Sequence, residues 1–228
     1  YLDCSNNSIT TLDISKNIGL TSLLCYKNKL TAIDVSKNTV LTNIKCYDNA
    51  LISIDVSKNI AIEKLYIYNN KFTTIDVSKN IALKELLCMN NALTSIDVSK
   101  NTELTHLYCY NNSITNLDVS NNVKLQCLRC YNNKLTSLDV TKNIVLRHLS
   151  NYGNYLNVCY RTHVQDFGWQ DTVKDGASSG TSGQSKRLEG IEIYIDGDAG
   201  LRIQYTTHVQ VYGWLPWASN GDMSGTSG

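Results

Sequence analysis

Histidine, cysteine and glutamate recur at one spacing in the middle of the chain. Glu85, His106, Cys127 and His148 follow one another at intervals of 21 residues. These residue types are ligands of zinc and related metals. If the fold stacks successive 21-residue units in register, the side chains stand together, and the sequence predicts a weak, open zinc site at His106, Cys127 and His148. The alternative is a set of unrelated surface residues, among which we expect Cys127 to be the most accessible thiol.

Most of the cysteines occupy a different position of the same interval. This column consists of Cys4, Cys25, Cys46, Cys88, Cys109 and Cys130, with Ile67 at the same place in its unit. The isoleucine indicates that the position needs a small or medium apolar side chain, and free cysteine packs in this way. We therefore expect buried, reduced thiols. Cys159 lies outside the column and has no evident partner.

Two polar columns share the period. One consists of Asp13, Asp34, Asp55, Asp76, Asp97, Asp118 and Asp139, and the other of Asn28, Asn49, Asn70, Asn91, Asn112 and Asn133. A row of carboxylates raises the alternative of calcium, but calcium needs several oxygens per ion, and Asp before Ser-Lys-Asn is a typical turn cap. We expect the aspartates to cap turns. The asparagines should bond to backbone where the chain turns inward, because buried amides must be satisfied.

The common interval reflects an internal repeat. Six complete units of the form L-x-x-L-x-C-Y-x-N-x-L-T-x-I-D-V-S-K-N-x-x fill residues 20–145, with partial units on either side. Such self-similarity predicts a solenoid. Alternating apolar residues at 22–26 predict a short strand whose Leu23 and Cys25 point inward. The segment L-x-x-L-x-C-x-x-N-x-L resembles the leucine-rich repeat, with cysteine where that family usually has leucine.

The resemblance covers residues 1–154 and implies a mostly β fold, a right-handed leucine-rich-repeat solenoid with a parallel sheet on its concave side. It also implies that the outward side chains of this sheet, here called the concave face, bind a protein partner. The candidate residues are Tyr26, Tyr47, Tyr66, Tyr68, Met89, Tyr108, Tyr110, Arg129, Tyr131 and Tyr152. Rigid aromatic side chains with polar tips, together with Arg and Met, are typical of recognition surfaces. The alternative is self-packing of stacked rings that only stabilises the sheet.

After Asn154 the 21-residue repeat stops and another one begins. Residues 156–183 return as 201–228 at an offset of 45 residues, including the motif H-V-Q-x-x-G-W at His163 and His208. This motif, followed in the first copy by G-T-S-G-Q-S-K-R-L-E-G-I, resembles the clostridial hydrophobic repeat with a tryptophan, called ChW. Alternating isoleucines at 191–195 and alternating apolar residues at 201–205 predict strands. We expect residues 155–228 to be a small all-β ChW region with one full and one truncated copy.

The tryptophans of this region support two interpretations. Trp169 and Trp214 recur with the motif and are expected in the core, whereas Trp217 has Thr172 as its counterpart and is the better candidate for exposure. All three are candidate glycan contacts. The histidines of the motif recur with the fold and are expected to be structural.

Composition narrows the function. The net charge of +1 gives no basis for a nucleic acid or an anionic membrane as partner. The sequence has no run of 18 apolar residues, so it predicts no membrane-spanning helix. No catalytic triad or phosphate-binding loop is evident in the sequence. We therefore expect a protein without catalytic activity and without a cofactor.

The ChW resemblance implies a secreted or cell-surface protein of a Clostridium-like bacterium. We predict a binding or adhesion protein whose concave face holds a protein partner and whose ChW repeats anchor it or bind surface material. The alternative is a carbohydrate-binding module in which the tryptophans recognise glycan and the solenoid is a spacer. Because the chain starts inside a repeat and its second ChW copy stops at Gly228, we expect it to be part of a longer protein. The uncapped first rung, Leu2 to Cys4, is expected to self-associate.

Overall fold

The computed structural model describes most of the chain. It covers residues 1–155, 158–174, 178–180, 182, 184, 186, 188–195, 204–205, 208–209, 213–216, 218–219, 222 and 224–225. These residues form strands, turns and bends, and no helix occurs among them. The chain divides into two compact units, Tyr1–Tyr155 and Leu156–Gly228. The predicted mostly β fold is confirmed.

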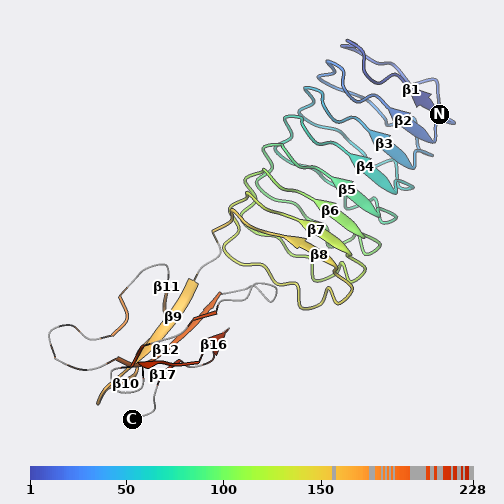
Figure 1. Ribbon diagram of the computed structural model, residues 1–228. Helices are drawn as coiled ribbons and strands as arrows, with labels where there is room; N and C mark the ends of the chain where they lie inside the picture. Colours follow the sequence, from blue (N-terminus) through green and yellow to red (C-terminus); the bar gives the residue numbers. More distant parts are fainter. Residues whose placement is uncertain are drawn as a thin grey trace. The chain divides into compact units, whose positions relative to one another are not determined.

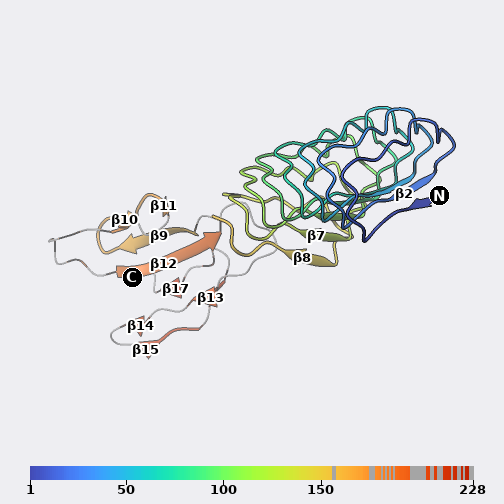
Figure 2. The same cartoon turned by 90° about the horizontal axis from the view of Figure 1, so that it is seen from above.

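Unit 1 is a solenoid whose short parallel strands form one sheet in chain order (Figure 1). The strands are β1 (Leu2–Asp3), β2 (Ser22–Leu24), β3 (Asn43–Lys45), β4 (Lys64–Tyr66), β5 (Glu85–Leu87), β6 (His106–Tyr108), β7 (Cys127–Arg129) and β8 (His148–Ser150). Paired residues are 21 apart, as in Leu65 opposite Leu86. Seen from above, successive rungs lie one over another as a coil (Figure 2). The register expected from the repeat is therefore confirmed.

The interior of the solenoid is filled by the same apolar positions in each rung. In one rung these are Leu41, Ile44, Cys46, Leu51, Ile54 and Val56, all between 0% and 8% exposed. A strand of three residues cannot bury one face alone, so each rung is covered by the rungs on both sides. Complete burial of one leucine-sized side chain contributes about 1.5–3 kcal/mol. The repeat thus builds one continuous core along the solenoid.

The cysteine column lies in this core, as predicted. Cys25, Cys46, Cys88, Cys109 and Cys130 have no exposed surface, and none of the eight cysteines, all of which the structure describes, forms a disulfide. Burial raises the pKa of Cys25 and Cys88 to about 12, which keeps both thiols protonated. Cys4 departs from the prediction because it is half-buried. It follows β1, the first strand of the sheet, and only one neighbouring rung covers it.

The predicted roles of the two polar columns are confirmed. Asp55 Oδ1 accepts the backbone N–H of Ser57 at 2.9 Å, and the bond recurs at each aspartate of the column. This bond lowers the pKa of Asp55. Asn49 Nδ2 donates to the carbonyls of Cys25 and Cys46 at 3.0 and 3.1 Å. Its Oδ1 accepts the N–H of Leu30 at 3.0 Å, so each such amide ties two rungs together.

A second asparagine column, in the Ser-Lys-Asn turns, was not anticipated. Its members are Asn38, Asn59, Asn80, Asn101, Asn122 and Asn143, which are at most 3% exposed. Asn59 Nδ2 donates to the carbonyls of Val35 and Asn38 in the preceding rung, at 3.0 and 2.8 Å. The recurrence of asparagine at this position, preceded by lysine in every member of the column except Asn122, was the available signal, but a polar residue beside a lysine is usually exposed. Each rung is thus fastened to the previous one at both of its turns.

Unit 2 is built around two long antiparallel strands, β9 (Val158–Val164) and β12 (Leu188–Ile195). Together with β10 (Gly168–Trp169), β11 (Val173–Lys174) and β17 (Ser224–Gly225) they form a five-stranded sheet. Two further pairs are β13 (Gln204–Tyr205) with β16 (Ala218–Ser219), and β14 (His208–Val209) with β15 (Gly213–Trp214). The strand expected at 191–195 is confirmed. Of the strand expected at 201–205, residues 201–203 lie outside the described part of the chain.

A search of the described residues for a helix long and apolar enough to cross a membrane found none.

Candidate binding surface

Tyrosines form two stacks along the concave face. Tyr26, Tyr47 and Tyr68 stack with ring centroids 4.4 and 4.2 Å apart and planes within 10° of parallel. Tyr110, Tyr131 and Tyr152 do the same at 4.3 and 4.5 Å. The rung spacing of a parallel sheet, about 4.8 Å, places identical side chains at stacking distance. The repeat therefore produces the stacks without any further device.

The stacking decides what the tyrosines present to a partner. Within each stack, neighbouring rings cover each other's faces, so ring edges and hydroxyl groups are what remain for contact. Burial, followed by the neighbouring Tyr47 hydroxyl, raises the pKa of Tyr68 well above its ordinary value. The hydroxyl group of Tyr68 therefore stays protonated and remains a hydrogen-bond donor.

Met89 separates the two stacks. It occupies the tyrosine position of its rung and is only 9% exposed. Methionine is flexible and polarisable and makes favourable contacts with aromatic rings. With so little exposed surface, Met89 offers a partner little contact area. Its role in partner binding is therefore smaller than that of the tyrosines.

A polar network occupies the middle rungs of the concave face. Lys64 Nζ lies 2.8 Å from Glu85 Oε1, and the Tyr66 hydroxyl donates to Glu85 Oε2. Burial by itself would raise the pKa of Glu85, but these two donors outweigh it and lower the pKa. Burial, followed by the bond to Glu85, raises the pKa of Tyr66. Lys45 Nζ lies 5.0 Å from the centre of the Tyr66 ring. The network thus fixes Tyr66 in place.

Cys127 lies in the expected register but not in the expected environment. It pairs with His106 on one side and with His148 on the other. The prediction of an accessible thiol is wrong, because Cys127 is only 4% exposed. Its thiol donates a hydrogen bond to the Tyr108 hydroxyl on the neighbouring strand at 3.6 Å. Cys4, which is half-buried, is the more exposed thiol.

The predicted metal site at His106, Cys127 and His148 is not formed. The described residues contain no group of three or more His, Cys, Asp and Glu side chains placed to hold a metal ion. His106 contacts Thr105 Oγ1 at 3.0 Å and meets the Tyr108 ring edge-on, whereas His148 is exposed. Sharing a column brings the three residues onto neighbouring strands, but their side chains do not converge.

A ladder of exposed amides borders the tyrosine stacks. The residue after each tyrosine position has a positive φ: Asn6, Lys27, Asp48, Asn69, Asn90, Asn111, Asn132 and Gly153, with φ between 52° and 66°. Asn90 Nδ2 donates to Asn69 Oδ1 at 2.6 Å, and the chain of such bonds ends on Asp48. Asparagine tolerates this left-handed conformation better than most residues. The sequence signal for this ladder is the first asparagine of the recurring Tyr-Asn-Asn.

In unit 2 the structure places one of the three candidate tryptophans in detail. The Trp169 ring is half-buried, with the Arg161 guanidinium 4.8 Å above it and the His163 ring edge-on at 5.3 Å. His163 Nδ1 lies 3.2 Å from Glu189, and Arg161 pairs with Glu192 at 2.7 Å. For Trp214 only the backbone, in β15, is described. Trp217 lies outside the described residues. Trp169 is thus held in a polar cluster, and the Arg161 guanidinium covers one face of its ring.

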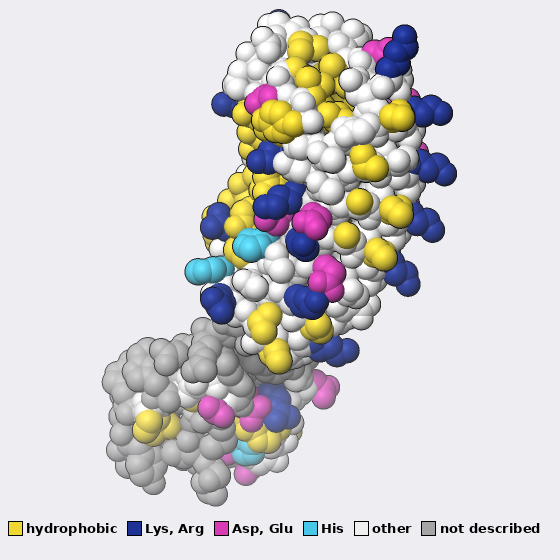
Figure 3. All heavy atoms as spheres, turned by 90° about the vertical axis from the view of Figure 1, so that its right-hand side faces the viewer, with side chains coloured by type: hydrophobic (Ala, Val, Ile, Leu, Met, Phe, Trp, Pro, Cys, Tyr) yellow, Lys and Arg dark blue, Asp and Glu magenta, His cyan; other side chains and the backbone are white. Residues whose placement is uncertain are grey.

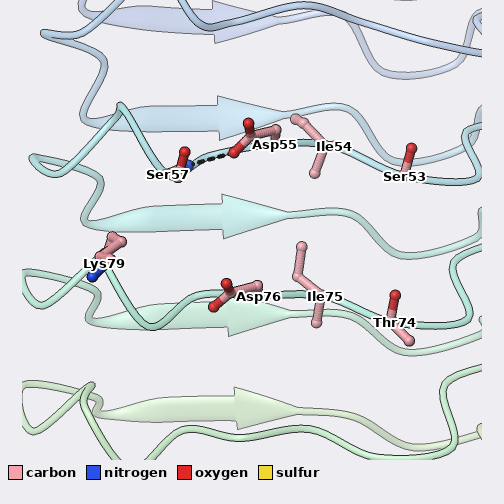
Figure 4. A pocket seen from close by; sticks show the side chains of 8 residues that line it. All are labelled: Ser53, Ile54, Asp55, Ser57, Thr74, Ile75, Asp76 and Lys79. Carbon is pink, nitrogen blue, oxygen red and sulfur yellow. Dashed lines mark hydrogen bonds between the residues drawn. The ribbon is translucent and has the colours of Figure 1, made fainter.

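A shallow groove lies between two rungs on the side of the Asp-Ser turns (Figure 4). It has a volume of about 250 Å³ and is lined by Ser53, Ile54, Asp55, Ser57, Thr74, Ile75, Asp76 and Lys79. Pockets for small molecules usually measure about 300–1,000 Å³ and enclose most of the ligand. Asp55 is engaged in its turn, as the bond to Ser57 in Figure 4 shows. The groove follows from the repeat and carries no separate ligand chemistry.

Solved structures support the solenoid fold. The functional domain of InlJ from Listeria monocytogenes, whose description states that it includes a cysteine ladder, is similar with 46% sequence identity and a TM-score of 0.67. The match covers 67% of this chain and 34% of that chain, so this chain spans about a third of the InlJ domain. Internalin C2 of Listeria monocytogenes is 24% identical, with a TM-score of 0.60 and coverage of 67% and 71%. YopM of Yersinia pestis is 18% identical, with a TM-score of 0.52 and coverage of 60% and 44%, and shows the fold alone.

The second unit matches a family model. Residues 163–197 and 208–228 match the model described as clostridial hydrophobic W, which is the family predicted from the H-V-Q-x-x-G-W motif. A comparison with curated proteins found no match. The chain therefore joins a bacterial leucine-rich-repeat solenoid, similar to those of the internalins, to clostridial hydrophobic W repeats.

Proposed function

We propose that the chain is part of a secreted or cell-surface binding protein without catalytic activity. Its concave face holds a protein partner, and its ChW repeats attach it to surface material. Two comparisons support this proposal: the solenoid resembles that of the internalins, and the second unit carries ChW repeats. The tyrosine-rich face runs along the sheet from Tyr26 to Tyr152.

The stacking of the tyrosines is the observation that carries the proposal. Sugars are held by the open faces of aromatic rings, but here neighbouring rings cover each other at 4.2–4.5 Å. The remaining hydroxyls and ring edges suit the amides and side chains of a polypeptide. Tyrosine also contributes contact area at a low cost in conformational entropy, because it has few rotatable bonds. These properties favour a protein partner for this face over a glycan.

A variant that removes hydroxyls but keeps the rings tests the proposal. The immobilised chain is used to select from a phage-displayed random peptide library, with Tyr68→Phe/Tyr110→Phe as the comparison variant. We expect peptides that bind the natural chain about five- to 150-fold more tightly than the variant, since loss of two hydrogen bonds of about 0.5–1.5 kcal/mol each has this size. Phenylalanine retains the stacks, so thermal unfolding should change little. Selected peptides that bind both proteins equally well would contradict the proposal.

The alternative, glycan recognition by the ChW tryptophans, is tested separately. A glycan array is probed with the natural chain and with Trp217→Ala. Specific glycan binding that Trp217→Ala abolishes, together with no peptide binding at the concave face, would make the solenoid a spacer. The position of Arg161 over the Trp169 ring argues against Trp169 as the sugar platform, because one ring face is already covered.

A further inference from the structure

Charges cancel on the middle rungs of the concave face. Lys64 pairs with Glu85 at 2.8 Å, and Lys84 pairs with Glu63 at 3.0 Å. These are four charged side chains on β4, β5 and the residues just before them, and all of them have a partner of opposite sign. Apart from Lys45 of β3, which lies over the Tyr66 ring and takes part in none of the described ion pairs, the middle of the face therefore presents little net charge to a partner.

The last three rungs differ. The segments 104–110, 125–131 and 146–152, which contain β6, β7 and β8, have no Asp or Glu. They contain Arg129, Arg147, His106 and His148, here called the basic end. Within residues 1–155 the ion pairs are Lys64–Glu85, Lys84–Glu63 and Lys124–Glu103, and neither arginine takes part in one. Figure 3 shows histidine side chains close to Lys and Arg side chains in the lower half of the solenoid in that view.

Arg129 is held in place without being neutralised. Its guanidinium lies 4.7 Å from the centre of the Tyr108 ring, while the side chain is exposed. A cation over an aromatic ring keeps its charge and its hydrogen-bond donors. Tyr108 is itself fixed by the Cys127 thiol at 3.6 Å. The buried cysteine thus supports the tyrosine, and the tyrosine presents the arginine to solvent.

We propose that the basic end receives an acidic segment of the protein partner, an inference that rests on the proposed function of the concave face. Arginine binds carboxylates through two parallel hydrogen bonds. Arg129 is in register with Ser150, and Arg147 lies three residues before Ser150, so the two arginine backbones are roughly 11 Å apart. Alternate side chains of an extended peptide are about 7 Å apart, and the long arginine side chains can bridge the difference. Two aspartates or glutamates two residues apart therefore reach Arg129 and Arg147 together. The stack of Tyr110, Tyr131 and Tyr152, of which Tyr152 is 63% exposed, runs through the same three rungs.

The geometry favours an acidic peptide over a nucleic acid. Single-stranded nucleic acids bind through long basic grooves and through aromatic rings on which bases stack. Here the rings of the neighbouring stack cover each other, with planes within 10° of parallel. The chain as a whole has a net charge of only +1. A local pair of arginines on an otherwise balanced surface suits one or two carboxylates.

Fluorescein-labelled hexaglutamate is the probe. We expect the chain to bind it at low salt and to lose affinity as ionic strength rises from about 0.05 M to about 0.5 M. Arg129→Glu/Arg147→Glu should weaken binding at least about tenfold. The matched control is Lys16→Glu/Lys37→Glu, which makes the same change in net charge on exposed residues outside the concave columns. It should leave binding within about twofold, because charges farther apart than the Debye length are screened. Arg129→Gln/Arg147→Gln serves if the charge reversal unfolds the chain, and we expect an intermediate loss.

Three outcomes would overturn the inference: no binding of hexaglutamate by the natural chain, equal losses in the two Glu variants, or equally tight binding of inorganic polyphosphate that the arginine variant also weakens. The last outcome would indicate a general anion site. The peptides selected on the concave face separate this inference from the proposed function. If they require the hydroxyls of Tyr68 and Tyr110 but bind the arginine variant normally, the face binds protein and the acidic preference is wrong.

Discussion

The two faces of the eight-stranded sheet follow different rules although they are made from the same strands of two or three residues. The inward face repeats almost without change. Most strands have Leu at the centre, and Cys is the first residue after the strand. The first outward position changes from rung to rung and reads Ser22, Asn43, Lys64, Glu85, His106, Cys127 and His148. An inward side chain must fit between two copies of itself, whereas an outward one needs only to avoid its neighbours. A position that keeps the same residue type from rung to rung is therefore a packing position. A position whose residue type varies lies on the surface that is available for recognition.

The tyrosine column is an outward position that behaves in part like an inward one. It is regular because stacked rings stabilise neighbouring rungs, by about 0.5–1.5 kcal/mol for each aromatic pair. It is nevertheless half-exposed over most of its length, and Tyr152 at its end is 63% exposed. Packing and recognition thus use the same side chains, which is why the two interpretations of the column could not be separated from sequence.

The largest expected effect tests the contrast between the two faces with one chemical change. Leu86 and Leu87 are neighbours in β5, with Leu86 fully buried and Leu87 half-buried on the concave face. We expect Leu86→Ala to lower the free energy of unfolding by about 2–5 kcal/mol, because a cavity opens in the core. Leu87→Ala should cost less than about 1.5 kcal/mol, because less apolar surface is lost from a packed environment. Urea denaturation of the two variants measures the difference, and equal losses would refute the distinction between the faces.

An intermediate effect is expected from the two environments of cysteine. Cys109→Ser places a hydroxyl in a fully buried apolar column and should cost about 1–3 kcal/mol. Cys127→Ser should cost less than about 1 kcal/mol, because the new hydroxyl can replace the thiol in the bond to the Tyr108 hydroxyl. Thermal and urea unfolding under reducing conditions compare the two. A larger loss at Cys127 would show that its apolar contacts outweigh the polar one.

The smallest effect concerns the left-handed residue after each tyrosine. Lys27 has a φ of 53° at a position where asparagine prevails. We expect Lys27→Asn to raise the free energy of unfolding by about 0.5–1 kcal/mol, because asparagine adopts this conformation at lower cost. Lys29→Asn, at an exposed position that is not among the positive-φ residues, is the control and should change stability by less than about 0.5 kcal/mol. No gain at Lys27, or the same gain at both positions, would mean that backbone strain there is negligible.

Much of the solenoid was predictable because its determinants are local and repeated. The period of 21 residues set the register, so that Cys127 lies between His106 and His148 as expected. Alternation within 22–26 indicated which side chains point inward, and Asp before Ser-Lys-Asn indicated the turn caps. The second asparagine column was not predicted, because nothing within one unit shows that this asparagine becomes buried when the rungs stack. Unit 2 was recognisable by its motif, but the polar cluster around Trp169 joins β9, β10 and β12, which the motif alone does not bring together.

The sequence by itself determined the solenoid, its register and the apolar positions that face the core, because each depends on a pattern repeated every 21 residues. Only the tertiary structure decided how exposed each outward side chain is. Cys127 points out of the core and is still only 4% exposed, and its thiol contacts the Tyr108 hydroxyl of the neighbouring rung. The histidines beside it do not converge on a metal site. Exposure on this surface depends on the size and conformation of side chains one rung away, and a periodic pattern contains no information about either.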